Sequence, residues 1–142
     1  MKTLKSIILG LALLLVCGAV NANPVNDNEN LTATHAVNTY IDAITRGKLN
    51  GLNDVLDQHV KFNMLRGKKM LSFDKKEMMD FFKGDKNVEQ DCVTSTDIVE
   101  SNTDIKVVKV DMKYKGFTRS NYVTVANTGD GWKITNVYSV FK

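Results

Sequence analysis

Residues 108–125 read VKVDMKYKGFTRSNYVTV, and apolar residues alternate with polar ones on both sides of Lys115-Gly116. Alternation with a period of two is typical of a β-strand that buries one face, and a Lys-Gly pair between two such runs indicates a turn. If the strands pair across this turn, Tyr114 faces Phe117. The other predicted pairs are Met112 with Arg119, Val110 with Asn121 and Val108 with Val123. The stretch therefore predicts an antiparallel hairpin with one apolar face.

The next strand, residues 132–141, extends this face. Gly129-Asp130 indicates the turn that leads into it. A regular register across that turn gives the pairs Val125 with Ile134, Val123 with Asn136, and Asn121 with Tyr138. Both registers place the same residues of the shared strand on the apolar face, which helices must then cover. The opposite face is predicted to be polar, apart from a small apolar stripe of Tyr122, Val137 and Phe141.

The part of the chain before residue 108 supplies the helices and the remaining strands. Gly67-Lys68 is a two-residue hairpin signal between strand-like residues 60–66 and 69–73. In that hairpin Phe62 faces Phe73 and Met64 faces Leu71. Further strand-like runs cover residues 87–99 and 104–114. Helical spacing of apolar residues predicts helices over 32–46, 49–56 and 74–84, and the last of these has Met78, Phe81 and Phe82 on one face.

This order of elements predicts an α+β fold rather than alternating α/β units. We expect three N-terminal helices packed on a mostly antiparallel sheet of about six strands.

The first 22 residues have the order of a signal peptide. Lys2 and Lys5 precede an apolar run over residues 7–20, and Val20-Asn21-Ala22 follows as a cleavage signal. The run is shorter than the roughly 20 residues that a membrane span needs. We expect a signal peptide at 1–22, a flexible lead-in at 23–30 and one domain at 31–142, exported to the periplasm or secreted. Anchoring as a lipoprotein through Cys17 is disfavoured by the bulky Val16.

Charge and cysteine content limit the function classes. Lys2 and Lys5 leave with the leader, so the formal net charge falls from +3 to +1, and this balance argues against nucleic-acid binding. Cys92 is the only cysteine that remains, so no intramolecular disulfide is expected. The sequence has no spacing of ligands typical of a metal site, and we predict neither a metal nor a cofactor.

Three polar residues interrupt the predicted apolar face, namely Arg119, Asn121 and Asn136. A buried polar group without a partner costs about 1–3 kcal/mol, and an unpaired buried arginine costs more. These side chains must therefore lie at a rim, pair with one another or line a cavity. The alternative to a cavity is a solid core from which Arg119 reaches water.

The chain resembles the nuclear-transport-factor-2-like superfamily, and within it most closely exported bacterial proteins labelled "putative lumazine-binding". The resemblance is carried by residues 36–48 (AVNTYIDAITRGK), 73–82 (FDKKEMMDFF) and 131–134 (GWKI). It spans about residues 31–142. It implies a strongly curved sheet that forms a cone-like α+β barrel with a pocket inside, and a homodimer formed through the sheet.

The resemblance and the polar residues together predict a site for a small, partly apolar ligand with an anionic end. The predicted ligand-binding residues are Tyr40, Phe62, Met64, Met112, Arg119, Asn121, Asn136 and Tyr138. No titratable side chain is expected to point into the pocket, so no catalytic residue is predicted and binding without catalysis is favoured. The alternatives are an isomerase-, cyclase- or dehydratase-like enzyme and a dimerising interaction module.

Overall fold

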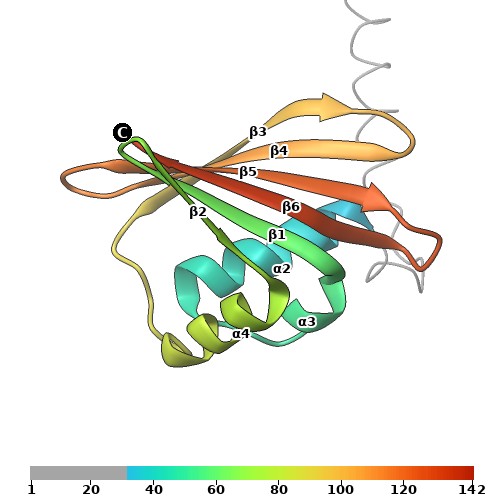
Figure 1. The fold of residues 1–142 in the computed structure, drawn as a ribbon, viewed down its shortest axis with the longest axis horizontal. Coiled ribbons are helices and arrows are strands. Elements are labelled where there is room, and N and C mark those ends of the chain that lie inside the picture. The colour runs from blue at the N-terminus through green and yellow to red at the C-terminus, as the bar shows by residue number, and fades with distance from the viewer. Residues whose placement is uncertain (1–31) are drawn as a thin grey trace, which may run out of the picture.

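The computed structural model describes residues 32–142 (Figure 1). Along this part of the chain, two helices and two strands are followed by a third helix and four more strands. Their bounds are α2 (Ala33–Arg46), α3 (Leu52–Val55), β1 (Leu56–Arg66), β2 (Lys69–Phe73), α4 (Lys75–Gly84), β3 (Val93–Ser101), β4 (Ile105–Lys113), β5 (Thr118–Asn127) and β6 (Trp132–Phe141). The predicted signal peptide, Cys17 and the lead-in at 23–30 lie outside the described residues. Within residues 32–142, no helix is long and apolar enough to cross a membrane.

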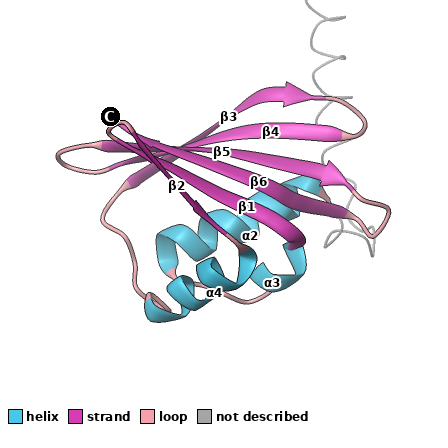
Figure 2. Ribbon diagram, viewed as in Figure 1, coloured by secondary structure: helices cyan, strands magenta, loops and turns pink. Residues whose placement is uncertain are grey.

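The six strands form one mixed sheet in the order β2-β1-β6-β5-β4-β3. β1 and β6 run parallel, and the other neighbours are antiparallel. The helices lie on one face of the sheet, where α2 packs on β4, β5 and β6 and α4 packs on β1 (Figure 2). The predicted α+β class and strand number are confirmed. The description of three N-terminal helices holds only for α2 and α3, because α4 follows the first hairpin, in agreement with its predicted range of 74–84. The sheet stays open, with β2 and β3 as its edges, so the strongly curved, cone-like barrel implied by the resemblance is not formed.

The two predicted hairpins have the expected registers. Phe62 pairs with Phe73 and Met64 with Leu71 between β1 and β2. Between β4 and β5, Val110 pairs with Asn121 and Met112 with Arg119. Tight turns join these strands, so the alternation of side chains fixes both the register and the buried face.

β6 departs from its predicted register because it contains a β-bulge. Val125 pairs with Ile134 as expected, but Thr124 pairs with Asn136, which leaves Thr135 as an extra residue. One inserted residue reverses the faces of all that follow. The pairs are therefore Val123 with Val137 and Asn121 with Ser139, not with Asn136 and Tyr138.

The bulge overturns several predicted orientations. Asn136 and Tyr138 lie on the outer face, away from the helices, and Asn136 Oδ1 accepts a hydrogen bond of 3.0 Å from Asn63 Nδ2. Val137 is buried in the core, and Phe141 pairs with the inward-facing Arg119. The predicted outer stripe of Tyr122, Val137 and Phe141 is thus wrong for its last two members.

The ends of the helices follow local signals. The Thr32 hydroxyl accepts from the backbone N–H of His35 at the start of α2, and Gly47 ends this helix in a left-handed conformation. Asp74 and Glu77 form a capping box at α4. Met78 and Phe82 of α4 are buried, but Phe81 is 59% exposed, contrary to prediction.

The remaining boundaries shift by a few residues. The predicted second helix is a single turn, because β1 already begins at Leu56. β3 begins at Val93, six residues later than expected, after an irregular segment that packs on the end of α2. In that segment Asn87 N–H donates to Gly47 O, and Gln90 N–H donates to Thr45 O.

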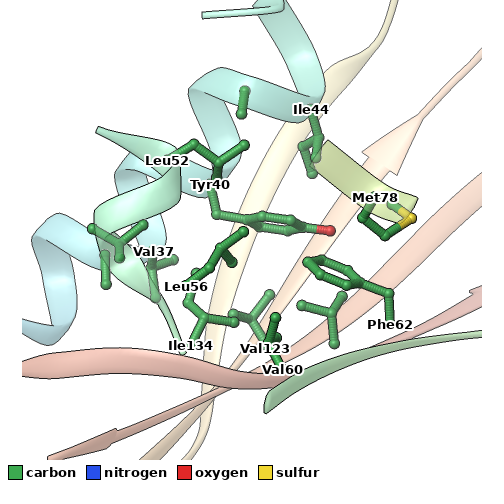
Figure 3. Close-up of a cluster of buried hydrophobic side chains, with 14 of the residues drawn as sticks. Val37, Tyr40, Ile44, Leu52, Leu56, Val60, Phe62, Met78, Val123 and Ile134 are labelled. Atoms are coloured by element: carbon green, nitrogen blue, oxygen red, sulfur yellow. The ribbon is translucent and has the colours of Figure 1, made fainter. Parts of the chain in front are cut away.

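The core lies between the helices and the inner face of the sheet (Figure 3). Tyr40 of α2 and Phe62 of β1 have ring centroids 6.4 Å apart, and Phe62 also contacts Phe82 of α4. Tyr40, Phe62 and Met112, three of the predicted ligand-binding residues, are fully buried here.

Candidate ligand-binding cavity

A cavity of about 520 Å³ opens between α4 and the ends of four strands. Each strand contributes side chains from its inner face, and α4 contributes the buried Met78 together with Glu77 and the exposed Phe81. The lining residues are Met64, Arg66, Leu71, Phe73, Glu77, Met78, Phe81, Arg119 and Phe141. Apolar side chains form most of the wall, and its charged members are Arg66, Arg119 and Glu77.

Arg119 is held at the wall by neutral groups. Its Nε donates to Asn121 Oδ1 at 3.0 Å, and its Nη2 lies 3.4 Å from Ser139 Oγ. The Ser139 hydroxyl donates in turn to Asn121 Oδ1 at 2.7 Å. Asn121 is fully buried, and its amide nitrogen donates to Val110 O. Asn121 and Ser139 thus fix the guanidinium of Arg119 without neutralising its charge.

The ring of Phe141 contacts two guanidinium groups. The Cζ atoms of Arg66 and Arg119 are each 5.7 Å from the centre of its ring, a distance at which the π-system attracts a cation. Among residues 32–142, neither arginine forms an ion pair. The lining also holds the carboxylate of Glu77, so two guanidinium groups and one carboxylate leave a net positive charge, which favours an anion at this position.

A smaller hollow of about 140 Å³ adjoins the cavity. The two share Phe81 and Arg119 in their linings. Ile44 of α2 and Tyr114, which follows β4, also line the hollow, and the Tyr114 hydroxyl donates to Gln90 Oε1 at 3.2 Å. Burial raises the pKa of Tyr114, and its interaction with Cys92 adds to this shift.

The predicted site residues fall into three groups. Met64 and Arg119 line the cavity, and Asn121 lies behind Arg119 and orients it. Tyr40, Phe62 and Met112 belong to the core. Asn136 and Tyr138 lie on the outer face, so they are not part of this cavity.

Sequence reasoning missed Arg66, Ser139 and Phe141. Arg66 could have been found, since it follows Met64 by two residues and therefore shares its face. Ser139 and Phe141 could not be found from alternation alone, because the bulge at Thr135 reverses their orientation.

One titratable acid, Glu77, does line the cavity, contrary to prediction. Its Oε2 accepts from the backbone N–H of Asp74 at 2.8 Å, as part of the capping box. Neither histidine lines the cavity: His35 is on α2 near Thr39, and His59 lies in a separate depression between β1 and α4. In the described part of the chain, no group of three His, Cys, Asp or Glu residues could hold a metal ion.

A family model described as "Putative lumazine-binding" matches residues 28–139 of this sequence. The chain belongs to this family. Membership in the putative lumazine-binding family agrees with the resemblance seen in the sequence motifs. The matched residues include all three helices and every residue that lines the cavity except Phe141. A search of curated proteins gives no significant match.

Solved structures similar to this member of the putative lumazine-binding family share its fold. An NTF2-like protein of unknown function from Silicibacter pomeroyi has a TM-score of 0.65 at 18% identity and covers 83% of this chain and 100% of its own. A second such protein, from Shewanella baltica, has a TM-score of 0.62 at 10% identity, covering 84% and 98%. A ketosteroid isomerase-like protein from Erwinia carotovora atroseptica has a TM-score of 0.58 at 12% identity, covering 82% and 98%. These matches confirm the nuclear-transport-factor-2-like fold.

Proposed function

We propose that this domain binds a small, partly apolar molecule with an anionic group in the cavity beside Arg119, without transforming it. The observation that carries the proposal is the pair of guanidinium groups over Phe141, neither of them in an ion pair with the described residues, in a wall that is otherwise apolar apart from Glu77. The cavity volume of about 520 Å³ lies within the range of about 300–1,000 Å³ typical of small-molecule sites.

A pair of matched fluorescent probes tests the charge preference. 1-Anilinonaphthalene-8-sulfonate and N-phenyl-1-naphthylamine share their rings, but only the first carries a negative charge. We expect the anionic probe to bind more tightly. The substitution Arg119→Gln should weaken binding of the anionic probe about 10-fold, because a charge-assisted hydrogen bond is lost. It should leave the affinity for the neutral probe unchanged. Fluorescence titration measures both affinities.

The control for this test is Arg46→Gln. Arg46 lies on the exposed side of α2, where it pairs with Asp42, so its loss should change neither affinity. Far-ultraviolet circular dichroism verifies that each variant is folded before titration. Equal binding of both probes by the unmodified domain, or no effect of Arg119→Gln, would contradict an anion site in the cavity.

An isomerase-, cyclase- or dehydratase-like enzyme is the second candidate, since Glu77 lines the cavity. Such chemistry needs a carboxylate that is free to accept a proton from substrate. Glu77 instead accepts the Asp74 backbone N–H and stabilises the start of α4. This role favours binding over catalysis.

Export and dimer formation complete the proposal. We infer that the leader is removed after Ala22 and that the exported domain forms homodimers through the outer face of the sheet. Tyr122 and Tyr138 pair across β5 and β6 on that face, and both are half-buried. Their rings give this face apolar surface, and apolar surface patches can mark contact sites between proteins.

Native mass spectrometry of protein recovered from the exported fraction tests these inferences together. We expect the mass of a dimer of chains that begin at Asn23, with additional mass from a retained small molecule. A chain that still begins at Met1 would contradict export with cleavage. A monomer at high concentration would contradict the dimer.

A further inference from the structure

The Tyr40 hydroxyl is the one buried side-chain polar atom in residues 32–142 that has no hydrogen-bond partner. Its side chain is fully buried. Native proteins rarely keep such an atom, because burial removes its water and nothing replaces the lost hydrogen bond. Phenylalanine would fill the same space without this penalty, so the hydroxyl needs a reason that the core itself does not supply.

The hydroxyl is directed toward the cavity wall. In Figure 3 the ring extends from α2 beside Phe62, and its oxygen points toward Met78. Met78 forms part of the lining of the 520 Å³ cavity. Ile44, one turn after Tyr40 on α2, lines the smaller hollow. The hydroxyl therefore lies behind the region where the two hollows adjoin.

Arg119 lines both hollows, and its charge acts on Tyr40. Burial raises the pKa of the Tyr40 hydroxyl, and the positive charge of Arg119 offsets part of this rise. The hydroxyl thus stays protonated at neutral pH and can donate a hydrogen bond near a fixed cation. A protonated donor beside a cation suits an anionic oxygen.

We propose that Tyr40 is the innermost contact of the binding site, where its hydroxyl donates to an oxygen of a ligand carboxylate that Arg119 also binds. This inference rests on the proposed function and narrows the ligand class to small carboxylates. Access requires displacement of the Met78 side chain, which is unbranched and has three rotatable bonds. The backbone of α4 need not move.

Tyr40→Phe tests the inference, with 2-naphthoate and 2-methylnaphthalene as probes in calorimetric titrations. Without ligand, the variant should be at least as stable as the unmodified domain, with Tm raised by up to about 4–8 °C. Its affinity for 2-naphthoate should fall about 10-fold, because one hydrogen bond to a charged group is lost. Its affinity for 2-methylnaphthalene, which has no oxygen, should not change.

Tyr138→Phe is the matched control, since Tyr138 lies on the outer face, and it should bind both probes normally. If the unmodified domain binds 2-naphthoate and Tyr40→Phe binds it equally well, the inner contact is wrong and the proposed function stands. If Tyr40→Phe lowers Tm and leaves both affinities unchanged, the hydroxyl has a structural role and the inference is overturned. If the unmodified domain binds neither 2-naphthoate nor the sulfonated probe, the proposed function itself fails.

Discussion

Val137→Asp is expected to abolish the folded state, whereas Val140→Asp leaves it intact. Val137 is 1% exposed and packs in the core, where it is paired with Phe62 of β1. A carboxylate there has no partner and loses its hydration. The cost of about 4 kcal/mol or more is exceptional for one substitution and approaches the whole stability of a domain, about 5–15 kcal/mol. Thermal and urea unfolding followed by circular dichroism measure the effect.

Val140 is the matched control because it is the same residue type on the other face of β6. It is half-buried on the outer face beside Leu65, so an aspartate there keeps contact with water and should cost less than about 1 kcal/mol. A β6 without the bulge would reverse the two positions. A variant pair in which Val140→Asp unfolds and Val137→Asp folds would therefore show that the bulge is absent.

Gly47→Ala is expected to lower the free energy of unfolding by about 3 kcal/mol. Two effects contribute: alanine is strained in the left-handed backbone conformation, and its Cβ clashes with neighbouring atoms. Gly47 has φ of +63°, and an added Cβ would lie 2.3 Å from Asp85 O and 2.5 Å from Asn87 N. These are backbone atoms, so the segment after α4 must move away from the end of α2. That segment carries Asp85, Val88 and Gln90 of the smaller hollow. Urea unfolding measures the loss.

Gly67→Ala separates the two contributions. Gly67 has nearly the same φ, +60°, but nothing lies within 4 Å of an added Cβ. Its substitution should cost only the conformational part, about 1–2 kcal/mol. The difference between the two variants gives the free energy of the clash at Gly47. Equal losses would mean that the segment after α4 does not approach Gly47 closely.

Several features of the fold could be predicted because each depends on neighbours in the sequence. The hairpins around Gly67 and Lys115-Gly116 have the registers expected from their turns. Both α2 and α4 begin within one residue of the starts of their predicted ranges, 32–46 and 74–84. Of the site, Met64, Arg119 and Asn121 were placed on the correct face, because their strands alternate without interruption.

Other features depend on packing between distant segments. Helical spacing placed Phe81 with Met78 and Phe82 on the buried face of α4, but the Phe81 side chain is exposed. It lines the cavity, where α4 and the sheet do not pack closely enough to bury it. Gly47 directly follows the predicted range of α2, but its close contact with residues 85–88 depends on the path of the chain after α4.

The sequence by itself determined the α+β class, the ends of α2 and α4, and an apolar sheet face interrupted by Arg119 and Asn121, because these depend on residues that are close together in the sequence. The tertiary structure decided which residues of β6 meet that face. β6 pairs with β5 on one side and with the parallel β1 on the other, and the register shifts against both near Ile134. A bulge is set by two neighbouring strands at once, so no alternation within β6 predicts it. It turned Ser139 and Phe141 inward to complete the surroundings of Arg119.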